Sequence, residues 1–190
     1  MRTFVAVDIE EETRAAAALA IAELARRLAG SSESPEGIRW VDPHSMHVTL
    51  HFVGHVGEAE LAGLRAAVEE PFDVAPFDLE IGGLGLFPTS GPSRVVWLGI
   101  TAGADSLTKL HATLTERLRA AGLPTEHRTY KPHLTLGRVK SPRGSELRKI
   151  LADAALPAIP GSRIARVTLY ESRSARGAPE YVPLASSALG

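Results

Sequence analysis

The sequence predicts an α+β fold with two lobes related by an approximate twofold axis, each lobe an antiparallel-rich sheet flanked by helices. Strand-like and helix-like segments alternate along all 190 residues, and the second half repeats the element order of the first. A His-x-Thr-Leu sequence occurs once in each half, 86 residues apart at positions 47 and 133. Two copies of so long a unit are typical of a two-lobed fold rather than a solenoid. No extended linker separates them, so we expect one domain over 1–190, with repeats near 1–87 and 94–185 and a central groove carrying both motifs.

The first half is predicted as strand, helix, strand, helix and strand. The strands are rich in β-branched and aromatic residues, and the first helical segment contains neither Gly nor Pro. Gly30 and Pro71 follow the two helical segments and are typical ends of a helix. The five segments are residues 3–9, 11–29, 46–53, 58–70 and 77–87.

The second half repeats this order after a turn-rich segment at 88–92. Asp105 is a suitable N-cap for its long helix, and Gly122 is a suitable end. The predicted strands are 94–101, 132–139, 163–170 and 181–184, and the predicted helices are 105–121 and 146–155.

Composition excludes several classes of function. The chain has 21 basic and 22 acidic residues, so bulk charge does not indicate nucleic-acid binding. It contains no cysteine, which removes disulfides, thiolate nucleophiles and cysteine metal sites. The N-terminus lacks an apolar signal core, and no apolar run is long enough to span a bilayer. We therefore expect a cytoplasmic protein without a membrane segment or an obligate protein partner.

The two motifs predict a pair of matching half-sites. In a strand, alternate residues share a face, so His47 and Thr49 should point one way, while Val48 and Leu50 enter the core. The segment from His133 to Leu136 repeats this pattern. If a twofold axis relates the lobes, two imidazoles and two hydroxyls converge on one small site.

These residue types suit phosphodiester cleavage. The reaction needs a base for the incoming oxygen and an acid for the departing oxygen, and two histidines with ordinary pKa values near 6.5 supply both near neutral pH. Threonine hydroxyls can donate hydrogen bonds to the non-bridging phosphate oxygens. Neither role needs a metal or another cofactor.

With both motifs and their flanks in view, the chain resembles the 2H phosphoesterase superfamily, and within it the RNA 2′,3′-cyclic phosphodiesterases, also called the 2′–5′ RNA ligase family. The resemblance covers nearly the whole chain. It is carried by residues 2–8, 40–41, 47–54, 83–88, 94–99 and 130–138.

The resemblance implies that a 2′,3′-cyclic phosphate at an RNA end is opened to a 2′-phosphate, with His47 as proton donor and His133 as proton acceptor. It also implies that Thr49 and Thr135 contact the phosphate. Transfer RNA fragments and small cyclic nucleotides are candidate substrates. The chain departs from the family pattern at His51, where lysine is common, and at Tyr130, where phenylalanine is usual. Both departures bear on substrate preference.

Four further residues are candidate substrate contacts. Phe4 and Tyr130 could stack on a terminal base, although aromatic residues in strands more often belong to the core. By alternation His51 should share the face of His47 and touch substrate or line the rim of the site. Arg138 could bind phosphate. Strict alternation from His133 turns it away from the motif residues, however, so a structural ion pair is the competing interpretation.

Three alternative interpretations remain beside hydrolysis. Two are less well supported by the sequence, and the third uses the same residues as hydrolysis. His44, His47, His51 and His55 would align on a helix as metal ligands, but the neighbouring Val and Gly residues favour a strand, so no metal site is expected. Ligation through a 2′–5′ linkage is the same chemistry in reverse, and the sequence does not separate it from hydrolysis. A non-catalytic RNA- or nucleotide-binding module is disfavoured because both motifs are intact.

Overall fold

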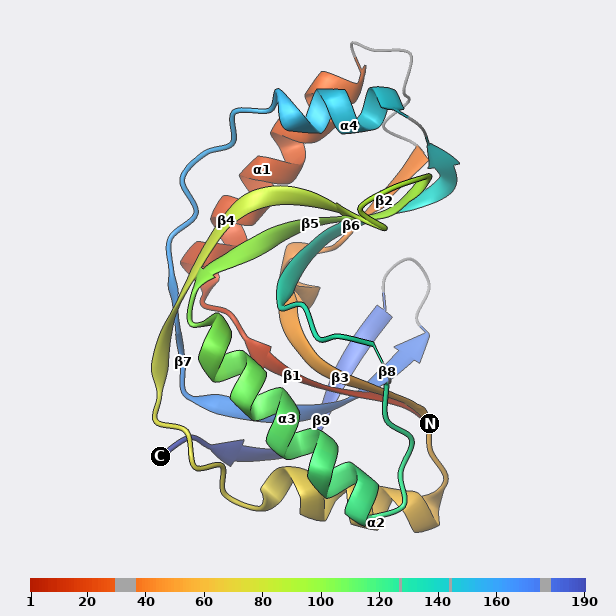
Figure 1. Cartoon of the computed structure of the whole chain (residues 1–190), viewed down its shortest axis with the longest axis vertical. Coiled ribbons are helices and arrows are strands. Elements are labelled where there is room, and N and C mark those ends of the chain that lie inside the picture. Colours follow the sequence, from red (N-terminus) through yellow and green to blue (C-terminus); the bar gives the residue numbers. More distant parts are fainter. Residues whose placement is uncertain (30–36, 127, 144, 175–178) are drawn as a thin grey trace.

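The computed structural model describes residues 1–29, 37–126, 128–143, 145–174 and 179–190. They form a single nine-stranded sheet, curled and largely antiparallel, with helices at both ends (Figure 1). The α+β class expected from the sequence is confirmed. The helices are α1 (Glu11–Ala29), α2 (Glu58–Glu69), α3 (Ala104–Ala120) and α4 (Ser145–Ala152), with a short 3₁₀ turn, η2 (Pro43–Ser45). The strands are β1 (Arg2–Asp8), β2 (Ile38–Trp40), β3 (His47–His55), β4 (Phe77–Phe87), β5 (Ser93–Ala102), β6 (His133–Arg143), β7 (Ser162–Ile164), β8 (Arg166–Ser174) and β9 (Pro179–Ala188).

The two strands that carry the motifs are neighbours at the centre of the sheet. The strand order is β7-β4-β5-β6-β3-β1-β8-β9, with β2 paired to β6. This order supports the expected repeat, because exchanging β1 with β5, β3 with β6, and β4 with β8 reproduces the central six strands in reverse. Superposition of the two halves stays a prediction. Each spatial lobe contains strands from both halves of the chain, because β4 lies beside β5 and β8 lies beside β1.

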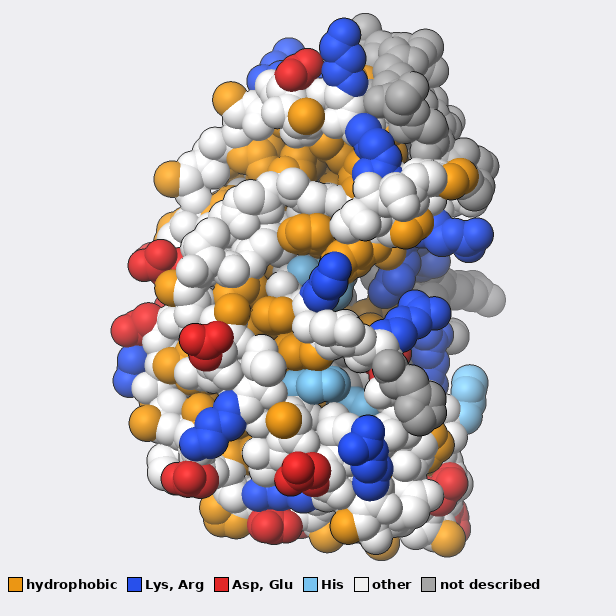
Figure 2. Space-filling model, viewed as in Figure 1, with side chains coloured by type: hydrophobic (Ala, Val, Ile, Leu, Met, Phe, Trp, Pro, Cys, Tyr) orange, Lys and Arg blue, Asp and Glu red, His pale blue; other side chains and the backbone are white. Residues whose placement is uncertain are grey.

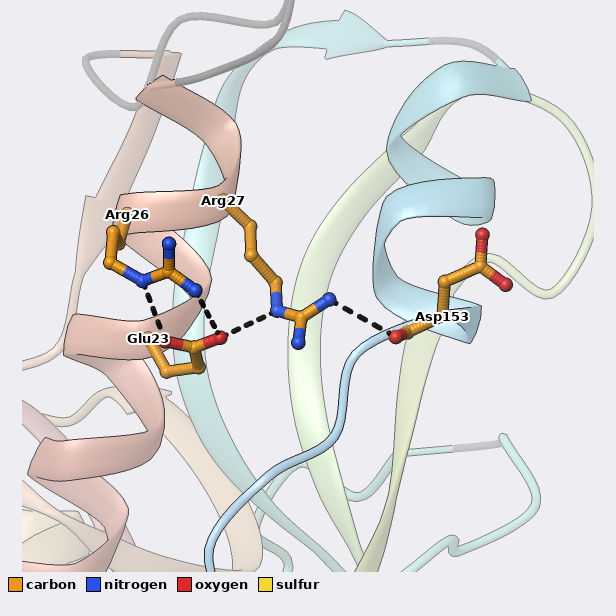
Figure 3. Close-up of polar contacts among 4 residues, drawn as sticks. All are labelled: Glu23, Arg26, Arg27 and Asp153. Carbon is orange, nitrogen blue, oxygen red and sulfur yellow. Dashed lines mark hydrogen bonds and ion pairs between the residues drawn. The ribbon is translucent and has the colours of Figure 1, made fainter.

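The helices also gather in pairs drawn from both halves. α1 contacts α4, and α2 contacts α3 (Figure 1). Figure 3 shows the polar link between the first pair. The Arg27 guanidinium donates to the carbonyl of Asp153 (3.1 Å) just after α4, and Glu23 accepts hydrogen bonds from Arg26 and Arg27 on α1. Each end of the curled sheet is therefore covered by one helix from each half of the chain.

The core lies between the sheet and these helices. The motif residues predicted to enter it do so, because Val48, Leu50, Leu134 and Leu136 are at most 1% exposed. Helix α3 packs against β3 and β5, and its leucines are fully buried: Leu107, Leu110, Leu114 and Leu118. This packing fixes the rear face of the strands and leaves the motif side chains on the concave face.

The predicted strand 163–170 is wrong as a single element. It consists of β7 and β8, which lie in different parts of the sheet, β7 at one edge against β4 and β8 between β1 and β9. Only Ala165 separates them. Two strands so close in sequence can lie near opposite edges of one sheet only if the sheet curls until those edges approach each other. The alternation of residues along a segment gives no information about that curl. None of the helices in the described ranges is long and apolar enough to cross a membrane.

Candidate active site

The start of each motif strand brings one histidine and one threonine onto the concave face. Val48 and Leu134 are the paired residues of β3 and β6. Antiparallel register extended by one residue sets His47 across from Thr135, and Thr49 across from His133. All four side chains are half-buried. On the face in Figure 2, histidine side chains lie between the upper and lower parts, and Lys and Arg side chains gather along the right-hand edge.

Both histidines are held by the same hydrogen bond. Nδ1 of His47 lies 2.8 Å from the carbonyl oxygen of Ser45, and Nδ1 of His133 lies 2.7 Å from that of Lys131. A carbonyl oxygen only accepts, so each Nδ1 carries the donated proton. This hydrogen bond fixes the tautomer of each neutral ring and leaves Nε2 to exchange a proton with substrate.

Each motif strand contains a β-bulge at the end of its motif, and these two bulges occupy equivalent positions; the register of each strand shifts once more farther along. On β3, Val5 pairs with His51 while Ala6 pairs with Thr49, so Leu50 is the extra residue. On β6 the register against β5 skips one residue in the same way, at Leu136. A bulge reverses the alternation of side chains beyond it. The residues after each motif therefore face opposite to what strict alternation predicts.

The prediction that His51 shares the face of His47 is wrong for this reason. The His51 side chain is fully buried on the rear face, with its ring stacked on His111 of α3 at 5.8 Å. Burial lowers its pKa. Phe52, which is 43% exposed, takes the front position instead. His51 is therefore a core residue and does not reach the groove.

The same reversal brings Arg138 to the front. Arg138 pairs with Val95, and the neighbouring Trp97 packs against His133 with ring centroids 6.1 Å apart. Paired residues share a face, so Arg138 lies on the concave side with the motif residues. Its charge contributes to lowering the pKa of His47 and of His133. The expectation that it faces away from them is corrected.

Phe4 and Tyr130 flank the site and are held by contacts with other residues. Phe4 is only 4% exposed and stacks on His47 (4.7 Å) and on Tyr170 (5.4 Å), which agrees with the alternative that it belongs to the core; stacking on a base stays a prediction. The Tyr130 ring stacks on His111 at 4.2 Å, and its hydroxyl donates to the carbonyl of Thr49 at 3.0 Å. One face of Tyr130 is thus occupied by protein.

Around His133 the walls are aromatic. The Phe87 ring meets the His133 ring edge-on at 5.0 Å. Gly85 lies directly under Trp97, where an added Cβ would stand 2.2 Å from the indole. This glycine therefore serves the packing of β4 against β5.

Burial sets the acidity of both rings. It lowers the pKa of His47 to about 4, although the Ser45 hydrogen bond and the charge of Asp8 oppose the change. Burial also lowers the pKa of His133, and the charge of Arg138 acts in the same direction. Asp8 is the strand partner of His47 and accepts two contacts from the Tyr170 hydroxyl (2.8 and 2.9 Å).

Sequence reasoning missed a pocket beside His47. It has a volume of about 180 Å³, and its walls include Asp8, Arg14, Tyr170 and Tyr181. Asp8 could have been suspected as a polar residue ending a buried strand. Tyr170 and Tyr181 come from strands more than 120 residues away, and no local pattern connects them to the motif.

The other histidines lie in several places, and His51 and His111 stack on each other behind β3. His44 lies in η2 and His55 is exposed at the far end of β3, while His127 is outside the described residues. Among the residues that the structure describes, no three His, Asp or Glu side chains are grouped to hold a metal ion.

Comparison with known proteins agrees with this arrangement. The model of the 2′–5′ RNA ligase superfamily matches residues 13–176. An RNA 2′,3′-cyclic phosphodiesterase of Methanothermobacter thermautotrophicus is 30% identical over 97% of this chain and 96% of its own length. One from Archaeoglobus fulgidus is 36% identical over 74% of this chain and 73% of its length.

A solved structure supports the fold over the whole chain. E. coli LigT in complex with 3′-AMP is 26% identical, covers 99% of this chain and 97% of its own, and superposes with a TM-score of 0.74. The enzyme class and the family expected from the two His-x-Thr-x motifs are confirmed by these matches. The chain belongs to the 2′–5′ RNA ligase superfamily of 2H phosphoesterases.

Proposed function

We propose that this protein hydrolyses RNA 2′,3′-cyclic phosphate ends to 2′-phosphates, with two histidines as acid and base and without a metal ion. The observation that carries the proposal is the pair of matching Nδ1–carbonyl hydrogen bonds, at His47 and at His133. They prepare two Nε2 atoms on one concave face for proton transfer. The names of the relatives in archaea support the cyclic phosphate as substrate.

In the proposed reaction, a water oxygen attacks phosphorus while Nε2 of His133 takes a proton from the water. The bond between phosphorus and the ribose O3′ breaks on the opposite side, and Nε2 of protonated His47 gives its proton to O3′. The product keeps the phosphate on O2′. The hydroxyls of Thr49 and Thr135 donate to the non-bridging oxygens, and Arg138 balances their charge.

One difference between the half-sites supports these proposed roles. Asp8 is the strand partner of His47, whereas Gly99 is the strand partner of His133. A carboxylate near an imidazole favours its protonated form. Asp8 therefore supports His47 as the acid, and the absence of a side chain at Gly99 supports His133 as the base. Bound phosphate adds a second negative charge that favours protonated His47.

The test uses a short RNA ending in a 2′,3′-cyclic phosphate, incubated with excess EDTA, with the product identified as a 2′-phosphate by mass spectrometry. Turnover should persist in EDTA. His47→Ala and His133→Ala should each lose several orders of magnitude, and the double variant should fall little further because the two act as a unit. His55→Ala, exposed at the other end of β3, is the matched control. Loss of turnover in EDTA that a divalent ion restores would refute the metal-independent mechanism.

Ligation is the second candidate, favoured by the description of the superfamily. It uses the same two histidines with a ribose hydroxyl in place of water. Supplying a 5′-hydroxyl RNA together with the cyclic phosphate end, and measuring joined product against 2′-phosphate, distinguishes the two directions.

A further inference from the structure

Three rings stack on one another beside the first motif strand. His51 of β3 is fully buried, and its ring centroid lies 5.8 Å from that of His111 on α3. The His111 ring also packs on Tyr130, with centroids 4.2 Å apart and planes only 7° from parallel. The proposed proton transfers use none of these three residues, so the ring stack has a role still to be assigned.

The ring stack supplies two hydrogen bonds to the backbone of β3. The Tyr130 hydroxyl donates to the carbonyl oxygen of Thr49 at 3.0 Å. Nδ1 of His111 lies 2.8 Å from the carbonyl oxygen of Leu50, and because a carbonyl only accepts, this nitrogen carries the proton. Thr49 is the motif threonine, and Leu50 is the extra residue of the bulge. The two hydrogen bonds therefore hold the strand at the point where its alternation reverses.

The neighbouring strand β6 is not suited to donate to the Leu50 carbonyl. β3 and β6 are paired at Val48 and Leu134. The same antiparallel register, extended by two residues, sets Pro132 across from Leu50, and proline has no backbone N–H. A carbonyl left without a donor inside the protein costs free energy. The His111 side chain supplies the donor from α3 instead.

The equivalent carbonyl in the second half-site is held by the main chain. The carbonyl oxygen of Leu136, the extra residue of the bulge in β6, accepts from the N–H of Val41 at 2.8 Å. Val41 directly follows β2, which pairs with β6. A backbone donor thus holds the bulge beyond Thr135, whereas a histidine side chain holds the bulge beyond Thr49.

The direction of the Thr49 hydroxyl depends on this part of the backbone. A bulge interrupts the ladder of hydrogen bonds between strands, so its residues are less constrained by pairing alone. If the carbonyl of Thr49 or Leu50 moves, the Thr49 side chain turns with it. A hydrogen bond weakens steeply as its geometry departs from linear, and the hydroxyl would then stabilise the developing phosphate charge less well.

We propose that Tyr130 and His111 are positioning residues for the proposed hydrolysis. Their hydrogen bonds to the carbonyls of Thr49 and Leu50 set the bulge and thereby aim the Thr49 hydroxyl at the phosphate. His51 packs against His111 from within the core and keeps its ring in place. The inference rests on the proposed function, because it assigns Thr49 a contact with the reacting phosphate.

The experiment is a double-mutant cycle on hydrolysis of the dinucleotide ApA ending in a 2′,3′-cyclic phosphate. Tyr130→Phe removes only the hydroxyl, and it should lower kcat about tenfold, the effect of one hydrogen bond, while KM changes by less than about twofold. In a Thr49→Ala background it should cost little further, because the hydroxyl that Tyr130 aims is already gone. Thr135→Ala is the matched control background, and there Tyr130→Phe should keep its full effect.

Two variants test His111 in the same assay. His111→Leu removes the donor to Leu50 and should lower kcat to a similar extent. His111→Asn, whose side-chain amide can donate in place of Nδ1–H, should restore most of the loss. Circular dichroism and thermal melting compare the folding of each variant with the wild type, and the Tyr130→Phe cycle decides alone if His111→Leu does not fold.

Equal losses from Tyr130→Phe in the two threonine backgrounds, or an unchanged kcat in the single variant, would overturn the positioning role and leave the hydrolase function standing. His111→Asn as slow as His111→Leu would remove His111 from that role. Absence of hydrolysis by the wild type would instead overturn the proposed function, and this inference with it.

Discussion

The pH dependence of the proposed hydrolysis should differ between kcat/KM and kcat, because burial lowers the pKa of both motif histidines in the free protein. With the pKa of His47 at about 4, only about one ring in 10³ is protonated at pH 7. The pKa of His133 is also below its ordinary value. The reactive form, with His47 protonated and His133 neutral, is therefore most abundant on the acid side of neutrality.

The magnitude follows from the two shifts. The limbs of the kcat/KM profile report the free enzyme and belong to the histidine pair as a whole, so both should lie below about pH 6.5. Above that value kcat/KM should fall tenfold per pH unit, or about 100-fold between pH 6.5 and 8.5. The profile of kcat should extend to higher pH, because the bound phosphate favours protonated His47.

Initial rates over pH 4.5–9 with the cyclic phosphate dinucleotide measure both profiles. A control substrate has sulfur in place of O3′, which leaves without protonation. With this substrate the alkaline limb of kcat/KM should disappear, and His47→Ala should regain activity while His133→Ala should not. A kcat/KM maximum at pH 7.5 or above would refute the lowered pKa values, and rescue of His133→Ala instead of His47→Ala would refute the assigned roles.

Three further outcomes are expected. Thr49→Ala and Thr135→Ala should each lower kcat about 10- to 10³-fold, as for one lost hydrogen bond to developing charge, and steady-state assays with the dinucleotide measure this. Asp8→Asn, which keeps a hydrogen-bond acceptor for Tyr170, should lower kcat/KM for the oxygen substrate more than for the sulfur substrate; equal losses would contradict a role through His47. His51 is buried with a lowered pKa, so the unfolded chain binds its proton first and stability falls as pH drops below about 6.5. In His51→Leu the free energy of unfolding, measured with denaturant, should depend less on pH between 7.5 and 5.5. Its slope should fall by at most about 1.4 kcal/mol per pH unit.

The parts of this fold that the sequence predicted are those set by local periodicity. The helix predicted at 11–29 coincides with α1, and the strand predicted at 46–53 lies within one or two residues of β3. The two His-x-Thr-x motifs marked the half-sites because alternation holds over their four residues. Over such short segments, the face of a side chain depends only on the rise and pleat of one strand.

Alternation failed where the strands contain bulges. His51 and Arg138 lie one or two residues beyond Leu50 and Leu136, the extra residues of the two bulges. Nothing in the sequence beside them marks a bulge except Gly137, whose added Cβ would stand 2.7 Å from Ile38. Both errors have the same cause, which is a bulge at the end of each motif.

Contacts between strands that are distant in sequence could not be predicted from local patterns either. Tyr170 reaches Asp8 across the β1–β8 pairing, which joins the two ends of the chain. Two strands so far apart in sequence are brought together by the curl of the sheet, and the prediction of a single strand over 163–170 had already missed that curl.

The near symmetry of the site raises the question of how two matching His-x-Thr-Leu motifs could take the opposite roles proposed for them in proton transfer. Identical rings held by identical hydrogen bonds would share their protons equally, so the distinction must come from neighbouring residues. Asp8 stands beside His47, and position 99 beside His133 excludes any counterpart, because a Cβ there would lie 2.8 Å from the carbonyl oxygen of Gly82. Introducing a carboxylate at Gly99 would require the β4–β5 backbones to separate. The pairing of these strands thus maintains the electrostatic difference that separates the acid from the base.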